Sequence, residues 1–235
     1  MKNILFLAVI GIFMISCAGD TEQTMTVSGN VKGLKKGTLY LQKIQDSTLI
    51  SIDSLTVEGN GNFEFKTEME SPEIFYLYLK KEDNNDINDR ITFFGEPGNI
   101  TINTSWDTFD TKAKIEGSET QKKLEEYRGV MSKFNTRNLE YLKFRFDPQV
   151  LKDSTALDSV KKLSDKNILR GYLYALNFAL NNRNSYISPY IALTEVSDAN
   201  TKYLDSINNS FSPEVANSKY GKELKKYLEE IKKNE

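Results

Sequence analysis

The sequence predicts an α+β protein in which an antiparallel, β-sandwich-like domain comes first and an α-helical region follows. From residue 26 to 117, apolar and polar residues alternate with a period of two, and clusters of Gly, Pro, Asn and Asp interrupt the alternation. After Ser118, apolar residues recur about every 3.6 positions, which is the period of a helix. We therefore expect a β domain over residues 26–117 and a helical region over residues 118–235. Many short strands at this spacing favour a sandwich or barrel.

Four alternating segments mark the clearest strands of the β domain. The segment Gly59-Asn60-Gly61-Asn62 separates two of them, and because its residues tolerate positive φ we expect a hairpin there. In each strand, every second residue is apolar, as required of a strand with one face in a core. These residues are Leu39 and Leu41, Phe63 and Phe65, Phe75, Leu77 and Leu79, and Ile100 and Ile102.

The helical region is expected to begin with two long helices. Ser118 is placed as the N-cap of the first, with Gln121 completing a capping box. The second should cover residues 154–182, and Gly171 in its middle predicts a break. The apolar positions are Leu124, Tyr127, Met131 and Phe134 in the first helix, and Leu157, Val160, Leu163, Leu169, Tyr172, Leu173 and Leu176 in the second.

Shorter helices are expected over residues 189–196, 199–208 and 218–233. The last is amphipathic, with Leu224, Leu228 and Ile231 on its inner face and Lys and Glu outside. It therefore predicts a charged helix that covers one edge of the core.

Residues 1–16 are expected to form a secretion signal. Lys2 gives a basic start, and the apolar run over residues 4–15 is shorter than the roughly 20 residues of a spanning helix. Met14-Ile15-Ser16-Cys17 resembles the bacterial lipobox, with Met14 where Leu is usual. The resemblance implies cleavage before Cys17 and attachment of acyl chains such as palmitate to it. The alternative is an ordinary signal with a chance Cys near its end.

A tether over residues 17–25 would hold the folded body close to the membrane. Its polar part extends at most about 25 Å. By resemblance to the bacterial sorting rule, Ala18 in place of Asp implies the outer membrane. Whether the protein faces the periplasm or the cell surface stays open; the acidic Asp20 and Glu22 resemble the start of lipoproteins that some bacteria route to the surface.

The composition of the chain excludes several classes of chemistry. Without residues 1–16 it holds 30 basic and 33 acidic residues, so no basic face is expected, and neither nucleic acid nor anionic lipid heads are favoured as partners. The chain has no His, which excludes Ser-His-Asp catalysis and imidazole metal sites. Its only Cys is assigned to lipid. We therefore expect no enzyme, no cofactor and no metal.

Several segments together resemble a known family. They are Asp53-Ser54-Leu55-Thr56-Val57, Gly61-Asn62-Phe63-Glu64-Phe65, Phe93-Phe94-Gly95-Glu96-Pro97-Gly98-Asn99-Ile100 and Ile115-Glu116-Gly117-Ser118. In this order they resemble the N-terminal domain of unknown function of envelope lipoproteins that continue into a thioredoxin-fold (TlpA-like, peroxiredoxin-related) thiol–disulfide domain. The helical stretches around residues 184–190 and 211–221 resemble the segment that joins the two domains. That thioredoxin domain and its Cys-x-x-Cys pair have no counterpart in this sequence.

Two local features are candidates for binding sites. Residues 83–89, Asp-Asn-Asn-Asp-Ile-Asn-Asp, offer oxygen ligands for calcium, but their spacing does not fit a calcium loop, and a solvated hairpin tip is the better interpretation. Tyr76 and Tyr78 share one face of a strand, opposite Phe75, and could form a stacking surface or pack against helices. Trp106, just beyond a strand, is the third aromatic candidate for a binding face.

Five Asp-Ser pairs resemble the O-glycan acceptor pattern of some bacterial envelope proteins. Asp-Ser pairs are also common in turns and helix caps, which is the competing interpretation. The acceptor residues would be Ser47, Ser54, Ser154, Ser159 and Ser206.

These observations favour a membrane-anchored envelope lipoprotein that binds or scaffolds and does not catalyse. Its partner would be an envelope protein or a glycan. The alternative, which rests on the family resemblance, is an accessory subunit that positions a separate thioredoxin-fold thiol–disulfide oxidoreductase at the membrane.

Overall fold

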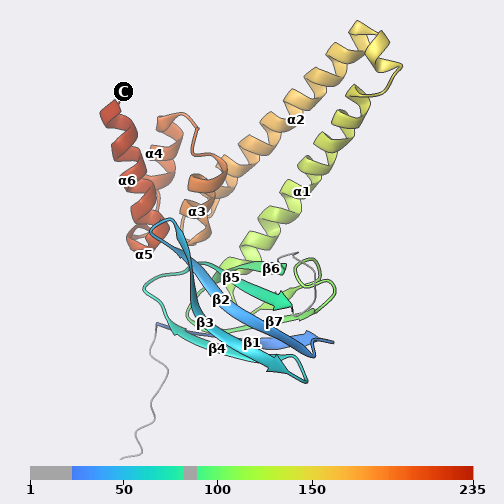
Figure 1. Ribbon diagram of the computed structural model, residues 1–235. Helices are drawn as coiled ribbons and strands as arrows, with labels where there is room; N and C mark the ends of the chain where they lie inside the picture. Colours follow the sequence, from blue (N-terminus) through green and yellow to red (C-terminus); the bar gives the residue numbers. More distant parts are fainter. Residues whose placement is uncertain (1–22, 82–88, 235) are drawn as a thin grey trace, which may run out of the picture.

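The computed structural model describes residues 23–81 and 89–234. Within these residues, eight strands form two four-stranded sheets (Figure 1). The first sheet has the order β4-β1-β7-β8 and the second the order β3-β2-β5-β6. The strands are β1 (Thr24–Lys32), β2 (Lys36–Gln45), β3 (Thr48–Glu58), β4 (Asn62–Glu68), β5 (Glu73–Lys81), β6 (Asp89–Gly95), β7 (Gly98–Ser105) and β8 (Lys114–Glu116).

The two sheets face each other across an apolar core, so the predicted α+β class is confirmed. Paired strands are antiparallel except β1 and β7, which run parallel. The alternating residues of the sequence supply the inner faces, and the rings of Phe75 and Phe93 stack in the core at 5.9 Å between centroids. The predicted inward residues of all four segments are buried: Leu39, Leu41, Phe63, Phe65, Phe75, Leu77, Leu79, Ile100 and Ile102.

The prediction of a hairpin at residues 59–62 is wrong. Gly59 and Gly61 do have positive φ, but they carry the chain from β3 in one sheet to β4 in the other. At Gly61 the backbone passes so close to Val31 that a Cβ would lie 2.1 Å from its carbonyl oxygen. The turn that joins the paired strands β2 and β3 is instead Asp46-Ser47, where both residues have positive φ, as in a type I′ hairpin.

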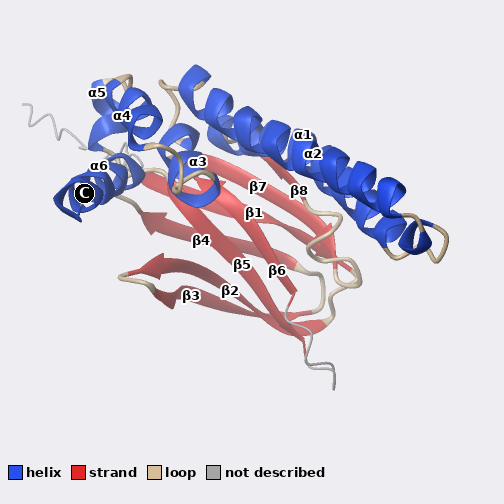
Figure 2. Ribbon diagram, turned by 90° about the horizontal axis from the view of Figure 1, so that it is seen from above, coloured by secondary structure: helices blue, strands red, loops and turns tan. Residues whose placement is uncertain are grey.

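Six α-helices occur in the described part of the chain after the sandwich: α1 (Glu119–Arg145), α2 (Ser154–Asn181), α3 (Ile187–Glu195), α4 (Thr201–Asn209), α5 (Pro213–Asn217) and α6 (Lys219–Asn234). Ser118 caps α1 as expected, because its hydroxyl accepts a hydrogen bond from the Gln121 backbone N–H at 2.9 Å. The short 3-10 turn η1 (Val150–Lys152) links α1 to α2. Together α1, the link and α2 form a two-helix arm that projects away from the sandwich (Figures 1 and 2).

The prediction of a helix break at Gly171 is wrong, because α2 continues through this residue. Gly171 is buried against α1, where an added Cβ would lie 3.5 Å from the ring of Phe134 and 3.6 Å from Met131. Nearby, the Asn167 amide donates to the Phe134 carbonyl at 2.9 Å and to the Asn138 side chain at 2.6 Å. A small residue and a polar contact thus set the register of the two helices.

A second core joins the helices to the outer face of the second sheet. Ile74 and Phe94 enter it from β5 and β6, and Phe94 meets Tyr190 and Tyr220 edge to face. At one side of this core, the carboxylate of Glu73 binds the ammonium groups of both Lys43 and Lys219. The helical region and the sandwich therefore share a buried, hydrogen-bonded interface.

No helix in residues 23–81 and 89–234 combines the length and the apolar character needed to cross a bilayer.

Candidate binding surface

Tyr76 and Tyr78 lie on the outer face of the second sheet, as the alternation predicted, and both are half-buried. Tyr40, Tyr78 and Arg90 are direct neighbours across β2, β5 and β6. The rings of Tyr40 and Tyr78 stack at 5.7 Å, and the Arg90 guanidinium lies 5.3 Å from the Tyr78 ring centroid and 5.7 Å from that of Tyr76. These aromatic faces are therefore largely covered by one another and by Arg90.

Trp106 lies elsewhere on the sandwich, just after β7, and is 44% exposed. Its ring covers Gly33, and the ammonium group of Lys81 lies 5.7 Å from its centroid. No ring contact among the described residues joins Trp106 to Tyr76 or Tyr78. The three aromatic candidates consequently do not form a single binding face.

The five serines of the glycan pattern are all exposed and lie in three separate segments of the chain. Ser47 is in the β2–β3 turn and Ser54 is on β3. Ser154 begins α2 directly after its N-cap Asp153, whereas the hydroxyls of Ser159 and Ser206 donate to helix carbonyls four residues earlier. Their modification stays a prediction, which the mass of the native protein tests.

Cys17 and residues 83–88 lie outside the described residues. The last residue of the acidic segment, Asp89, starts β6 and forms an ion pair with Lys81. Among the described residues, no group of three or more His, Cys, Asp or Glu side chains is arranged to hold a metal ion.

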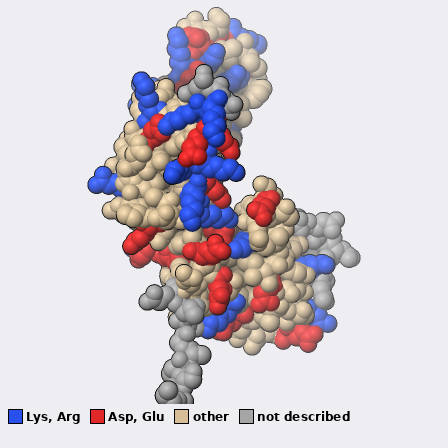
Figure 3. Space-filling view, turned by 90° about the vertical axis from the view of Figure 1, so that its left-hand side faces the viewer, with Lys and Arg blue, Asp and Glu red and all other residues tan. Residues whose placement is uncertain are grey.

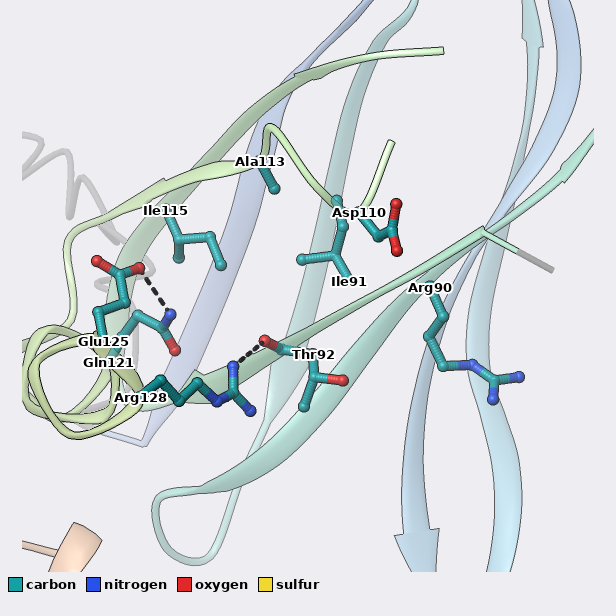
Figure 4. Close-up of a pocket in the computed structure, with 9 residues that line it drawn as sticks. All are labelled: Arg90, Ile91, Thr92, Asp110, Ala113, Ile115, Gln121, Glu125 and Arg128. Carbon is teal, nitrogen blue, oxygen red and sulfur yellow. Dashed lines mark hydrogen bonds between the residues drawn. The ribbon is translucent and has the colours of Figure 1, made fainter. Parts of the chain in front are cut away.

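A cavity of about 420 Å³ opens at the base of the arm, between the edge strands β6 and β8 (Figure 4). Arg90 and Arg128 supply cations and Asp110 and Glu125 supply carboxylates, so the lining selects neither charge. The remaining lining residues are Ile91, Thr92, Ala113, Ile115 and Gln121.

Side chains of α1 cap the open edge of β6 beside this cavity. The Gln121 side-chain oxygen accepts from the Phe94 backbone N–H at 2.8 Å, and Arg128 donates to the Thr92 carbonyl at 3.5 Å. Gln121 does not complete the predicted capping box, because its side-chain oxygen accepts from Phe94 and not from the Ser118 backbone N–H, while its amide nitrogen donates to Glu125. Glu96 accepts from the Glu119 backbone N–H at 2.6 Å, which fixes the start of α1. Side chains of α1 thus occupy some of the backbone hydrogen-bonding groups of β6 that could otherwise pair with another strand.

Hydrogen bonds from two buried or half-buried tyrosines also orient the base of the arm. Tyr127 on α1 donates to Glu195 at 3.1 Å, and burial, together with the nearby carboxylate, raises the pKa of its hydroxyl above the ordinary value. Tyr172 on α2 donates to Asp198 at 3.0 Å, and burial followed by this hydrogen bond raises the pKa of Tyr172 to about 12. Both hydroxyls therefore stay protonated and remain donors at neutral pH.

The arm carries most of the exposed large hydrophobic side chains of the described chain. Ten of the fourteen lie between residues 139 and 180, although this segment is under a fifth of the sequence. The ten are Leu139, Leu142, Phe144, Phe146, Leu151, Leu163, Ile168, Leu169, Leu173 and Leu180. The apolar face of a helix normally packs on a core, and these side chains of the arm are exposed instead.

Helix α2 has two apolar faces, of which only one packs on α1. Gly171 and Ala175 are buried, while Leu169, Leu173 and Leu180 are 55%, 47% and 41% exposed. At 3.6 residues per turn, Leu173 points about 200° away from Gly171, so the exposed leucines lie on the opposite side of the helix from α1. With the half-buried Leu176 they follow the 4-3-4 spacing of a coiled-coil seam. We call Leu169, Leu173, Leu176 and Leu180 the α2 stripe.

A groove of about 450 Å³ runs between α1 and α2 on the side of the arm. Leu139 and Leu142 from α1 and Ile168 from α2 supply its apolar lining. Asn135, Asn138, Arg145 and Ser164 complete it. The groove and the α2 stripe are separate apolar surfaces of the same arm.

The outer face of α6 is different in character. It is covered by Lys mixed with Glu (Figure 3), while Leu224 and Leu228 are buried beneath, as predicted, and Ile231 is half-buried. A solvated face of this kind needs no partner. The exposed apolar surface is on the arm.

By fold, the chain is a two-sheet β sandwich followed by a helical region with a projecting arm. Residues 25–124 match the model of a domain of unknown function (DUF4369). The match covers the sandwich from the second residue of β1 and ends within the first turns of α1, so most of the arm lies outside it. A search of curated proteins found no matching relative.

The sequence contained a signal for the arm that periodicity alone did not separate. Periodicity assigns one set of apolar positions to helix α2, and this set includes Leu157, Val160, Leu163, Leu169 and Leu173. They do not fall on one side, because Leu157 and Val160 lie on the same side as Gly171, whereas Leu169 and Leu173 are each about 200° away from Gly171. Plotting α2 on a helical wheel would have revealed two apolar faces and thus a second surface to cover.

Proposed function

We propose that the protein is a lipid-anchored lipoprotein of the bacterial outer membrane that acts as a non-catalytic binding module. In this proposal Cys17 carries the lipid, the sandwich is the body, and the arm holds an envelope protein. The observation that carries it is the concentration of exposed apolar side chains on residues 139–180. Large exposed apolar patches on folded proteins usually mark interaction surfaces.

The fixed base of the arm supports a binding role. The cap at Ser118, the contacts of Gln121 and Glu96, and the hydrogen bonds of Tyr127 and Tyr172 hold α1 and α2 against the body. A surface presented on rigid elements loses less conformational entropy when it binds. The α2 stripe suits a partner helix, because its 4-3-4 spacing is that of a seam between two helices.

Capture on the immobilised protein tests this role. The wild-type chain from residue 18 on, attached to resin, should retain the same envelope protein in repeated extracts. A variant with Leu169→Ser, Leu173→Ser and Leu180→Ser should lose it. The matched control changes three exposed apolar residues elsewhere, Ile44→Ser, Leu49→Ser and Tyr203→Ser, and should retain it. Equal retention by all three proteins, or none by the wild type, would refute the role of the arm.

Lipidation is tested separately. Cells fed an alkyne-bearing palmitate analogue should label the wild-type protein and leave a Cys17→Ser variant unlabelled. The label should fractionate with the outer membrane. A labelled Cys17→Ser variant, or a wild-type protein recovered without acyl chains, would contradict the anchor.

The second candidate is an accessory that positions a separate thioredoxin-fold oxidoreductase. The match of residues 25–124 to a domain of unknown function favours it, since the family resemblance places such a domain before thioredoxin domains. The same capture experiment decides between the two, because this candidate requires the retained protein to contain a Cys-x-x-Cys thioredoxin domain.

A further inference from the structure

The tip of the arm, residues 143–152, is its most exposed apolar part. Phe146 is 71% exposed, more than any other large hydrophobic side chain in the described residues, and Phe144 and Leu151 are each 56% exposed. Neither phenylalanine packs on another ring of the described chain. Three large apolar side chains at the end of the arm are thus exposed to solvent.

Cations are interleaved with these side chains. Lys143, Arg145 and Lys152 alternate with the apolar residues, and none has a carboxylate partner among the ion pairs of the described residues. The one acidic residue of the tip, Asp147, accepts a hydrogen bond from the Gln149 backbone N–H at 2.8 Å. The tip therefore combines bare apolar side chains with a net positive charge.

This local charge is hidden in the net charge of the chain. Residues 131–170 hold nine basic and five acidic residues, which leaves 22 basic and 28 acidic for the rest of the sequence. The outer part of the arm carries +4 and the remainder −6. Charge is thus segregated along the molecule, and a partner of the arm meets a positive surface.

We propose that this tip docks on an anionic lipid bilayer. Phe144, Phe146 and Leu151 would enter the interface, while Lys143, Arg145 and Lys152 meet lipid phosphates. The shape of the tip favours a bilayer over a protein socket. Phe144 and Phe146 are two residues apart, so they point to nearly opposite sides of the helix end. A fluid surface can cover both sides of a convex tip at once, whereas a protein partner would need a matching cup.

The tip and the start of the folded chain lie at opposite ends of the molecule. Strand β1 begins at the opposite end of the molecule from the tip (Figures 1 and 2). A lipid on Cys17 and the tip would therefore be two attachment points at opposite ends. A bilayer that held both would run along the length of the molecule.

Vesicle binding tests the proposal with the chain from residue 18 on, which lacks Cys17, so that an acyl anchor cannot contribute. The protein should co-sediment with vesicles of phosphatidylcholine and phosphatidylglycerol and much less with phosphatidylcholine alone. Changing Phe144, Phe146 and Leu151 to Ser should lower the affinity on the order of 100-fold. Changing Lys143, Arg145 and Lys152 to Gln should have an effect of similar size.

Matched controls separate the tip from the general surface. Lys32→Gln, Lys35→Gln and Lys36→Gln remove three exposed cations from the sandwich, and Ile44→Ser with Leu49→Ser removes exposed apolar side chains there. Both control variants should bind as the wild type does. Circular dichroism and thermal unfolding verify that every variant is folded.

Fluorescence then locates the contact. In a Trp106→Phe background, a Phe146→Trp side chain should be quenched by brominated acidic lipids, whereas native Trp106 in the unaltered chain should not be. Three results would overturn the proposal: no binding to acidic vesicles, equal binding by the tip variants, or self-association without lipid that the tip substitutions abolish. The last would assign the tip to a second copy of the chain.

Discussion

Replacing Glu73 by Gln should destabilise the protein strongly, because Glu73 joins the sandwich to α6 by a buried ionic cluster. Its side chain is only 6% exposed, and it binds Lys43 at 3.1 Å and Lys219 more closely still. Lys219 also donates to the Ile44 carbonyl at 3.0 Å, and its backbone N–H donates to Ser71 at 2.9 Å. The substitution keeps the shape of the side chain and removes its charge.

The magnitude follows from the burial of the three groups. A hydrogen bond to a charged group contributes about 1.5–3 kcal/mol, and breaking a buried ion pair costs about 3–5 kcal/mol. Lys43 and Lys219 are 25% and 30% exposed, so water partly replaces the lost carboxylate. We expect Glu73→Gln to lower the free energy of unfolding by about 3 kcal/mol. For a protein of this size, that is about 6–12 °C in Tm.

Urea unfolding followed by circular dichroism measures the loss. The matched control is Asp158→Asn, which breaks the exposed Lys162–Asp158 pair, whose side chains are 76% and 58% exposed. It should cost at most about 0.5 kcal/mol. Replacing Glu73 by Leu together with Lys43 and Lys219 by Met should recover most of the loss, because no ammonium group is then left unpaired. A Glu73→Gln variant as stable as Asp158→Asn would refute this reasoning.

Three further changes probe the base and the packing of the arm. Gln121→Ala should cost about 1–3 kcal/mol in urea unfolding by leaving the buried Phe94 N–H without an acceptor. Glu125→Ala, which leaves that acceptor in place, should cost less, and equal losses would contradict the role of the hydrogen bond. Gly171→Ala should raise the free energy of unfolding by about 0.5–1 kcal/mol, because Ala favours a helix and its Cβ would lie at an ordinary 3.5 Å from Phe134. Gly171→Leu should instead lower Tm, because the larger side chain would force α1 and α2 apart. Tyr172, whose pKa is raised to about 12 in the folded state from about 10 when unfolded, contributes stability below pH 10 that is lost as the pH rises to 12. A Tyr172→Phe variant should therefore show a shallower fall of Tm over that interval, and an unchanged fall would count against its burial.

The sandwich was predictable because its strands need only one buried face. Leu39, Phe65 and Ile100 alternate with polar neighbours, and such a pattern fixes which side chains face a core. The pattern does not state which strands pair. Gly59 and Gly61 have the turn chemistry of a hairpin, yet Phe63 and Phe65 complete the core from the opposite sheet, so the turn crosses between sheets. The parallel pairing of β1 with β7 likewise depends on tertiary packing.

The two helices of the arm were predictable from the sequence, but the exposed apolar surface of the arm was not. The cap at Ser118 and the apolar content of residues 154–182 were sufficient to predict where the two long helices lie. Whether Leu169 and Leu173 are buried depends on which elements pack beside α2. The short helices after it cover its base, and the rest of its outer face is left open. Tyr76 and Tyr78 show the reverse, because Arg90, Tyr40 and the second core cover rings that the sequence left available.

Site-directed photo-crosslinking in intact cells tests the binding role of the arm most directly. A photoreactive phenylalanine analogue at position 173 should form one discrete adduct with an envelope protein, and the Leu169→Ser and Leu180→Ser substitutions should abolish it. The same analogue at position 44, on the sandwich, should not form that adduct. If positions 142, 173 and 180 all fail to form an adduct in cells that make the protein, or if position 44 captures the same protein equally well, the arm is not a binding surface.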